Sequence, residues 1–149
     1  MRSHYEYSAQ EIALRAHHGQ SNQHNAEPYI LHVFRVAKAC EQRGLSTLHV
    51  AVAWLHDVVE DTTVDLSYLH NVFPDKTEIV AAVDLLTKKA GMTNEEYYRR
   101  IKENSLAGFV KVRDMQDNFS RNHHITDEPT RLRMGAKYSL GMDILREFM

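Results

Sequence analysis

Residues 51–61, AVAWLHDVVED, are strongly apolar at first and end in charged side chains. Apolar residues on every side of a helix are typical of a helix at the buried centre of a bundle. His56 and Asp57 emerge directly from this apolar run, and Glu60 and Asp61 follow one turn later. Buried charge is costly unless it is paired or bound to a metal. The segment therefore predicts both a central helix and a metal site at its end.

Helical periodicity continues on both sides of this segment, and no alternating run of β-branched residues indicates a sheet. Pro28, Pro74 and Pro129 fall where helices are expected to begin. We therefore expect an all-α fold, a single-domain helical bundle of about seven or eight helices over residues 1–149. The expected helices cover residues 8–18, with Ser8 as N-cap, and 29–43, 47–61, 65–72, 75–86, 93–104, 105–121 and 129–145.

Composition limits the classes of function. The chain has 149 residues, with 43% hydrophobic residues, 26% charged residues and a net charge of −2, which is ordinary for a soluble domain. The sequence has no excess of basic residues that would predict nucleic-acid binding. It also has no apolar run that would predict a membrane span or a signal peptide. We therefore expect a cytoplasmic protein with a small-molecule partner, and the sequence gives no oligomeric state. Cys40, the only cysteine, is expected to be a core residue.

Two further residues have ligand chemistry on otherwise apolar helix faces. His32 lies in PYILHVFRVA beside Val36, and Asp114 lies in FVKVRDMQDN beside Val110. Taken singly, His32 fits a hydrogen-bonded core histidine and Asp114 fits an exposed acid. Together with the His-Asp doublet they predict one divalent-metal site with two histidine and two aspartate ligands. Imidazole and carboxylate ligands suit Mn²⁺, Fe²⁺ or Zn²⁺, and Co²⁺ is a further candidate.

Four segments in a fixed order carry a resemblance to a known family. They are AHHGQ (16–20), EPYILH (27–32), HDVVEDT (56–62) and VKVRDMQDN (110–118). This set resembles the hydrolase domain of RelA/SpoT-type proteins, above all their small stand-alone alarmone hydrolases, which belong to the HD superfamily. The resemblance implies an HD-type helical fold and Mn²⁺-dependent removal of the 3′-pyrophosphate of (p)ppGpp.

The resemblance also implies roles for individual residues. The implied metal ligands are His32, His56, Asp57 and Asp114. Glu60 and Asp61 match the acidic pair that handles the attacking water, and Asn118 matches a polar residue beside the metal and the substrate ribose.

The sequence departs from this pattern where the related enzymes carry an adjacent Arg-Lys pair. Asn22 and Gln23 stand in its place, so donors with a fixed positive charge are lost. Arg113, directly before Asp114, stands where the related enzymes carry a small residue. The candidates for contacting substrate are Asn22, Gln23, His24, Lys88, Lys111 and Arg113, with Lys89 and His123-His124 as further cations. Two alternatives stay open: an HD-type nucleotidase or phosphatase acting on another nucleotide, and a nucleotide-binding regulatory module without turnover.

Overall fold

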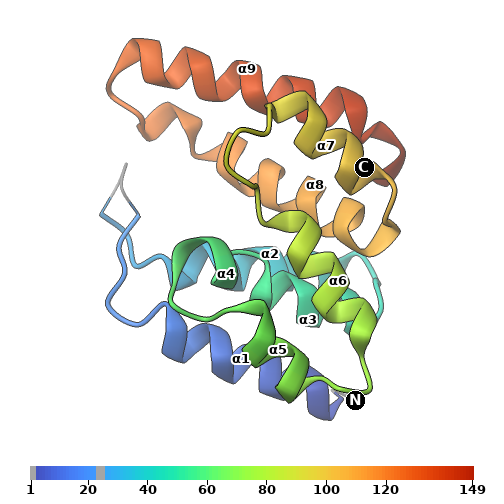
Figure 1. Cartoon of the computed structure of the whole chain (residues 1–149). Helices are drawn as coiled ribbons and strands as arrows, with labels where there is room; N and C mark the ends of the chain where they lie inside the picture. The colour runs from blue at the N-terminus through green and yellow to red at the C-terminus, as the bar shows by residue number, and fades with distance from the viewer. Residues whose placement is uncertain (1–2, 23–25) are drawn as a thin grey trace.

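The computed structural model describes residues 3–22 and 26–149, and within these ranges it contains helices and no β-strand. Figure 1 shows α7, α8 and α9 together at one end of the molecule, with α1 and α5 at the other. The prediction of an all-α bundle is confirmed. The helices are α1 (His4–Ala16), α2 (Ile30–Gln42), α3 (Thr47–Leu55), α4 (Val58–Asp61), α5 (Leu66–Val72), α6 (Thr77–Leu86), α7 (Asn94–Lys102), α8 (Ser105–Ser120) and α9 (Glu128–Ile144), with 3₁₀ turns at Asn122–His124 and Arg146–Phe148.

Most helix starts follow the chemistry of their caps. Asp65 accepts from the backbone N–H of Tyr68 at the start of α5, and Thr93 and Glu96 form a reciprocal capping box at the start of α7. The expected start of the first helix at Ser8 is wrong. Helix α1 begins four residues earlier, because the Ser3 side chain already accepts from the third residue of the helix.

The central helix is shorter than the apolar pattern predicts. We expected one helix to residue 61, but α3 ends at Leu55 and α4 begins at Val58. Asp57 has φ −109° and ψ 1°, which departs from helical geometry. The interruption thus falls at His56 and Asp57, the doublet that the sequence marks as a metal site.

Helix α3 forms the centre of the core and contacts α1, α2, α6 and α8. Every residue of α3 from Val50 to Leu55 is buried, as its apolar surface predicts. Cys40 of α2 is buried in the same core and has no disulfide partner, in agreement with the prediction. No helix in the described part of the chain combines the length and apolar character needed to cross a bilayer.

A short antiparallel bridge between Ser21 and Pro28 fixes both ends of the segment that precedes α2. The backbone N–H of Tyr29 donates to the Gln20 carbonyl at 2.8 Å, and that of Asn22 donates to the Glu27 carbonyl at 2.7 Å. These bonds fix the entry into α2, the helix that carries His32.

Two glycines of α9 differ in the room that they leave for a side chain. A methyl group at Gly141 would meet the Met115 sulfur and lie 2.8 Å from Cζ of Tyr98, whereas one at Gly135 would have its nearest contact at 3.6 Å, with Asn122. We expect Gly141→Ala to lower the free energy of unfolding by about 1–3 kcal/mol through overpacking. Gly135→Ala should raise it by about 0.5–1 kcal/mol, because alanine is the better helix former. Denaturant unfolding of the two variants checks the pair, and equal effects would contradict the packing of α9 described above.

Candidate metal centre

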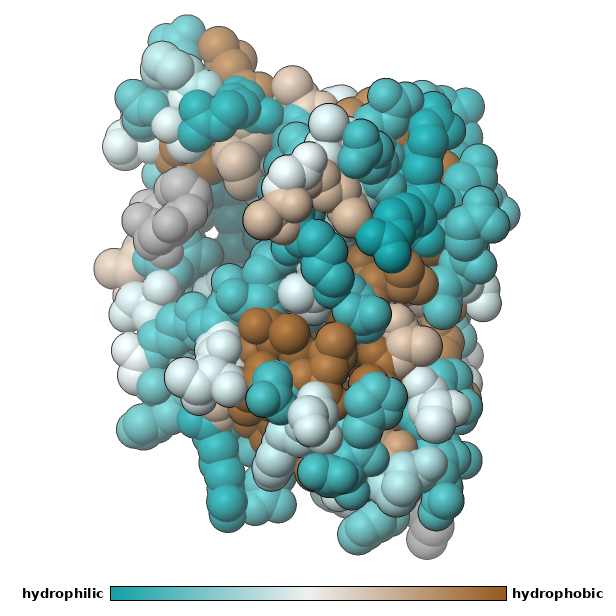
Figure 2. All heavy atoms as spheres, in the orientation of Figure 1, coloured by the Kyte–Doolittle hydropathy of each residue, from teal (hydrophilic) through white to brown (hydrophobic). Residues whose placement is uncertain are grey.

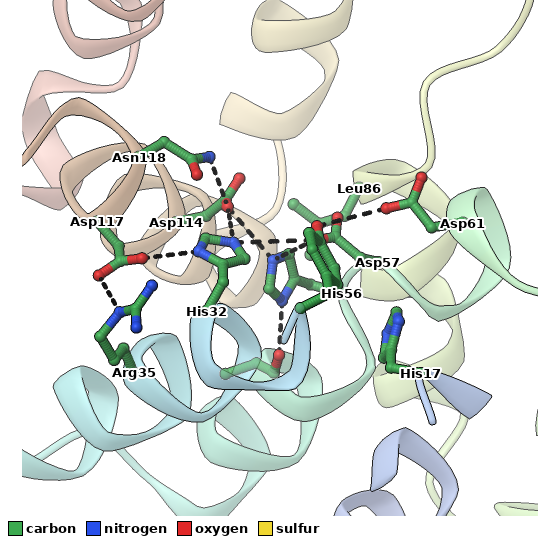
Figure 3. A network of polar contacts seen from close by, with 12 residues as sticks. His17, His32, Arg35, His56, Asp57, Asp61, Leu86, Asp114, Asp117 and Asn118 are labelled. Carbon is green, nitrogen blue, oxygen red and sulfur yellow. Dashed lines mark hydrogen bonds and ion pairs between the residues drawn. The ribbon is translucent and has the colours of Figure 1, made fainter. Parts of the chain in front are cut away.

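Four side chains from three separate parts of the sequence meet between α2, the α3–α4 junction and α8. His32 comes from α2, His56 and Asp57 from the α3–α4 junction, and Asp114 from α8. One ligand atom from each residue lies within 4.8 Å of the others. Figure 3 shows the two imidazoles and the two carboxylates pointing toward one another. The structure thus brings together all four residues that the sequence singles out.

The distances between these atoms suit one shared cation. His32 Nε2 lies 2.8 Å from Asp114 Oδ1 and 3.8 Å from Asp57 Oδ2, and His56 Nε2 lies 3.0 Å from Asp57 Oδ2. Two atoms that each lie about 2.1 Å from one ion are about 3.0–3.4 Å apart at octahedral or tetrahedral angles. His56 Nε2 is also fully buried and makes no hydrogen bond. A divalent metal would give this nitrogen a partner, so the residues present fit the ion that the sequence predicts.

Hydrogen bonds on the far side of each imidazole orient its free nitrogen. His56 Nδ1 lies 2.6 Å from the carbonyl of Ala53, which can only accept, so Nδ1 is the protonated nitrogen. His32 Nδ1 lies 2.8 Å from Asp117 Oδ2, and Arg35 donates to the other oxygen of Asp117 at 2.8 Å. Both histidines therefore present Nε2 to the centre, and an outer carboxylate or carbonyl fixes each ring, as is usual for metal-binding histidines.

The carboxylates of the cluster strongly favour positive charge on the groups around them. Burial lowers the pKa of His32, but the hydrogen bonds to Asp114 and Asp117 outweigh burial and raise this pKa to about 9. Burial also lowers the pKa of His56, but the nearby carboxylates of Asp57 and Asp114 outweigh burial and raise this pKa well above its ordinary value. Burial raises the pKa of Asp57, but His56 overrides it and holds this pKa at about 2. Ionised carboxylates that attract protons onto both imidazoles form a site that also attracts a cation.

The acidic pair lies beside this cluster. Ligand atoms of Asp57, Glu60 and Asp61 lie within 4.8 Å of one another. The Glu60 carboxylate accepts from the backbone N–H of Lys88 at 2.8 Å. The Tyr29 hydroxyl donates to Asp57 and lies 3.4 Å from Asp61. Burial and the neighbouring Asp57 raise the pKa of Asp61 to about 6, so this carboxyl can exchange a proton near neutral pH.

The cluster opens into a cavity of about 310 Å³. Figure 2 shows a hydrophilic hollow in this face, between α4 and the region of α8 and α9. Lys111 donates to Asp114 at 2.7 Å, and the Asn118 amide donates to the same carboxylate at 3.2 Å. The described residues that line the cavity are Gln20, Ser21, Asn22, Tyr29, Asp57, Glu60, Asp61, Lys111, Asp114, Asn118, Met134, Lys137 and Tyr138.

Several predicted substrate contacts lie elsewhere. Arg113 is buried on the other side of α8, where its guanidinium donates to the Phe148 carbonyl at 2.8 Å. The expectation that Arg113 faces the substrate is therefore wrong. The Lys88 ammonium donates to Asn94 at 2.8 Å and does not line the cavity. Lys89 pairs with Asp84 at the surface. Gln23 and His24 lie outside the described residues, while Asn22 lines the cavity.

The sequence analysis overlooked several residues of the site. Asp117 and Tyr29 each lie three positions from a predicted ligand, Asp114 and His32 respectively, so helical spacing is a signal that would have found both. His17 of the AHHGQ motif is buried, contacts the Tyr29 ring and hydrogen-bonds Gln20 at 2.7 Å. Tyr138 of α9 is buried and also lines the cavity.

Known proteins share this fold and parts of this sequence. The solved structure of a metazoan orthologue of SpoT, described as hydrolysing ppGpp, matches with a TM-score of 0.83 at 22% identity, over 98% of this chain and 88% of the other. A guanosine-3′,5′-bis(diphosphate) 3′-pyrophosphohydrolase of Aquifex aeolicus is 28% identical over 127 residues, which are 78% of this chain and 18% of the relative. A protein of the same name from Borreliella burgdorferi is 34% identical over 97 residues, 65% of this chain and 14% of the relative.

These curated relatives are much longer proteins, and this chain spans less than a fifth of their length. Their names agree with the resemblance to RelA/SpoT-type hydrolases, and the structural match agrees with the expected fold. The family model of the HD domain matches residues 9–115, which include all four residues of the cluster. This chain therefore belongs to the HD-domain family.

Proposed function

We propose that this chain is a metal-dependent nucleotide pyrophosphohydrolase that removes the 3′-pyrophosphate of ppGpp or a related guanosine nucleotide. The observation that carries the proposal is the buried cluster of two histidines and two aspartates, which opens into a hydrophilic cavity beside an acidic pair. The names of the relatives from Aquifex and Borreliella support the choice of substrate. We propose further that residues 1–149 act as one cytoplasmic unit.

In this proposal His32, His56, Asp57 and Asp114 hold one divalent metal, with Mn²⁺ as the first candidate. The metal, when bound, lowers the pKa of a water molecule toward about 7 and polarises a phosphoryl oxygen. Asp117 and Arg35 keep the His32 ring in orientation, and the Ala53 carbonyl does the same for His56.

Glu60 and Asp61 orient the attacking water and accept its proton. The bond from Glu60 to the Lys88 backbone fixes the first carboxylate, and Tyr29 lies beside the second. Water adds to the phosphorus next to the ribose, the bond between phosphorus and the 3′-oxygen breaks, and that oxygen takes up a proton as pyrophosphate leaves. Asn118, which donates to Asp114 and lines the cavity, is positioned to contact the nucleotide.

A second candidate function has one observation in its favour. The Arg-Lys pair of the related hydrolases is absent at Asn22 and Gln23, and the described lining of the cavity contains two lysines against four carboxylates. A nucleotide with fewer phosphates would need fewer cations. The shortage of cations therefore favours an HD-type nucleotidase or phosphatase as the second candidate. The acidic pair Glu60 and Asp61 argues against the third alternative, a binding module, because a module that only binds has no use for a pair that activates water.

A panel of nucleotides incubated with the Mn²⁺-loaded protein tests the proposal. We expect ppGpp to be cleaved with release of pyrophosphate, and activity to disappear when the metal is chelated. Orthophosphate released from simpler nucleotides would instead identify the nucleotidase. If no nucleotide turns over while metal and nucleotide both bind, the chain is a binding module and the hydrolase proposal fails.

A further inference from the structure

The cavity beside the candidate metal centre is short of positive charge. The described residues of its lining contribute four carboxylates and two ammonium groups. A nucleotide carrying several phosphates is recognised by cationic donors, which make the strongest hydrogen bonds to phosphate oxygens. The cations available in this cavity therefore decide which anions it can bind.

Three of the cations that the sequence suggested already have hydrogen-bond acceptors. Lys111 lines the cavity, but its ammonium donates to Asp114 at 2.7 Å and lies 5.2 Å from the centre of the Tyr97 ring. The Lys88 ammonium donates to Asn94, and the Arg113 guanidinium donates to the Phe148 carbonyl. Each of these three groups therefore already has an acceptor that competes with a phosphate.

Lys137 of α9 is a cation of the cavity whose ammonium group, unlike those three groups, has no partner among the described residues. It lines the cavity next to Tyr138 and is half-buried. Within residues 3–22 and 26–149, no hydrogen bond or ion pair holds its ammonium group. Asp114 and Glu60 lie near enough to influence its charge but do not pair with it. Burial is the main cause that lowers the pKa of Lys137, and the charge of the neighbouring Lys111 lowers it further.

A half-buried ammonium without a partner is a costly arrangement. Burial removes part of its hydration, and nothing in the described lining replaces the lost hydrogen bonds. A phosphate oxygen in the cavity would supply both the missing acceptor and the missing negative charge. Lysine binds phosphate as a compact point charge with three donors, so no special backbone geometry is needed.

We propose that Lys137 is a phosphate-binding residue of this cavity and takes the place of the Arg-Lys pair that is missing at Asn22 and Gln23. The ligand class is a nucleotide with a pyrophosphate group or an equivalent pair of phosphates. This inference rests on the proposed function for the identity of the substrate. Lys137 lies beyond residues 9–115, the part that matches the HD-domain model, so α9 supplies a determinant of specificity from outside the matched region.

Binding of inorganic pyrophosphate to the Mn²⁺-loaded protein tests the inference without requiring turnover. We expect Lys137→Gln to weaken the affinity for pyrophosphate about 10- to 100-fold, the effect of one charged hydrogen bond. Isothermal titration calorimetry measures the affinity, and elemental analysis verifies that the metal content is unchanged. Lys137→Arg should restore most of the affinity, because it returns the charge to the same place.

Lys89→Gln is the matched control, since it removes a lysine charge that pairs with Asp84 at the surface. It should bind pyrophosphate as the wild type does. If Lys137→Gln also binds as the wild type does, or if the wild type does not bind pyrophosphate, the inference is overturned. A wild type that binds pyrophosphate through Lys137 but leaves ppGpp intact would uphold the inference and refute the proposed hydrolase. With ppGpp as substrate, Lys137→Gln should raise KM more than it lowers kcat.

Discussion

Replacing Asp114 by asparagine should remove the bound metal and reduce hydrolysis to background. Asp114 approaches both imidazoles, with 2.8 Å to His32 and 3.3 Å to His56, and also accepts from Lys111. Asparagine preserves the shape but lacks the charge that a divalent cation needs. We expect the metal affinity to fall by more than about 100-fold, which is the upper end for the loss of an outer partner. Elemental analysis after dialysis measures the metal per chain.

Two further variants make this test quantitative. Asp117→Ala removes the carboxylate behind His32 and should weaken metal binding only about 10- to 100-fold. Asp84→Ala removes a carboxylate that pairs with Lys89 at the surface and should leave metal binding unchanged. Circular dichroism verifies that each variant folds. A folded Asp114→Asn variant that retains one metal per chain would show that the proposed ligand set is wrong.

Neutralising the acidic pair should slow turnover while leaving the metal in place. Glu60→Gln keeps an oxygen that can accept from the Lys88 backbone, so this substitution removes charge and little else. Asp61→Asn removes a carboxyl group whose pKa is raised to about 6 by burial and by Asp57. We expect each substitution to lower kcat about 10²- to 10⁴-fold, the usual contribution of general acid–base catalysis. Steady-state kinetics and metal analysis on the same preparations test this expectation.

Glu95→Gln is the control for this prediction, because Glu95 is exposed and pairs with Arg99 on α7. It should have normal turnover. Near-normal turnover in both Glu60→Gln and Asp61→Asn would exclude the pair from the mechanism. Loss of metal from either variant would instead make that carboxylate a ligand and require a different assignment of the cluster.

The positions of helices were largely predictable because their signals are local. Thr93 and Glu96 are three residues apart and form the capping box at the start of α7. Two helix boundaries differ from the prediction. Ser3 caps α1 before Ser8 can, and the apolar run that seemed continuous through residue 61 is interrupted at His56 and Asp57.

The cluster could be predicted because of the chemistry of its residues and not because of their positions along the chain. His32 and Asp114 are 82 positions apart, yet each was recognisable as a polar residue on an apolar helix face. Their roles as metal ligands stay a prediction until metal binding is measured. The substrate contacts were less predictable, because a lysine or arginine is common on any helix surface and its spacing does not reveal what it faces.

The sequence by itself determined an all-helical chain, the buried helix at its centre and the four residues whose side chains converge. These follow from periodicity, capping and the cost of burying charge, which act over a few residues or on single side chains. Only the tertiary structure decided which cations reach the cavity. Arg113 faces the Phe148 carbonyl, whereas Lys137 of α9 lines the cavity without a partner among the described residues. The packing of α8 against the C-terminal segments directs both side chains, and contacts between segments so distant in sequence leave no local pattern.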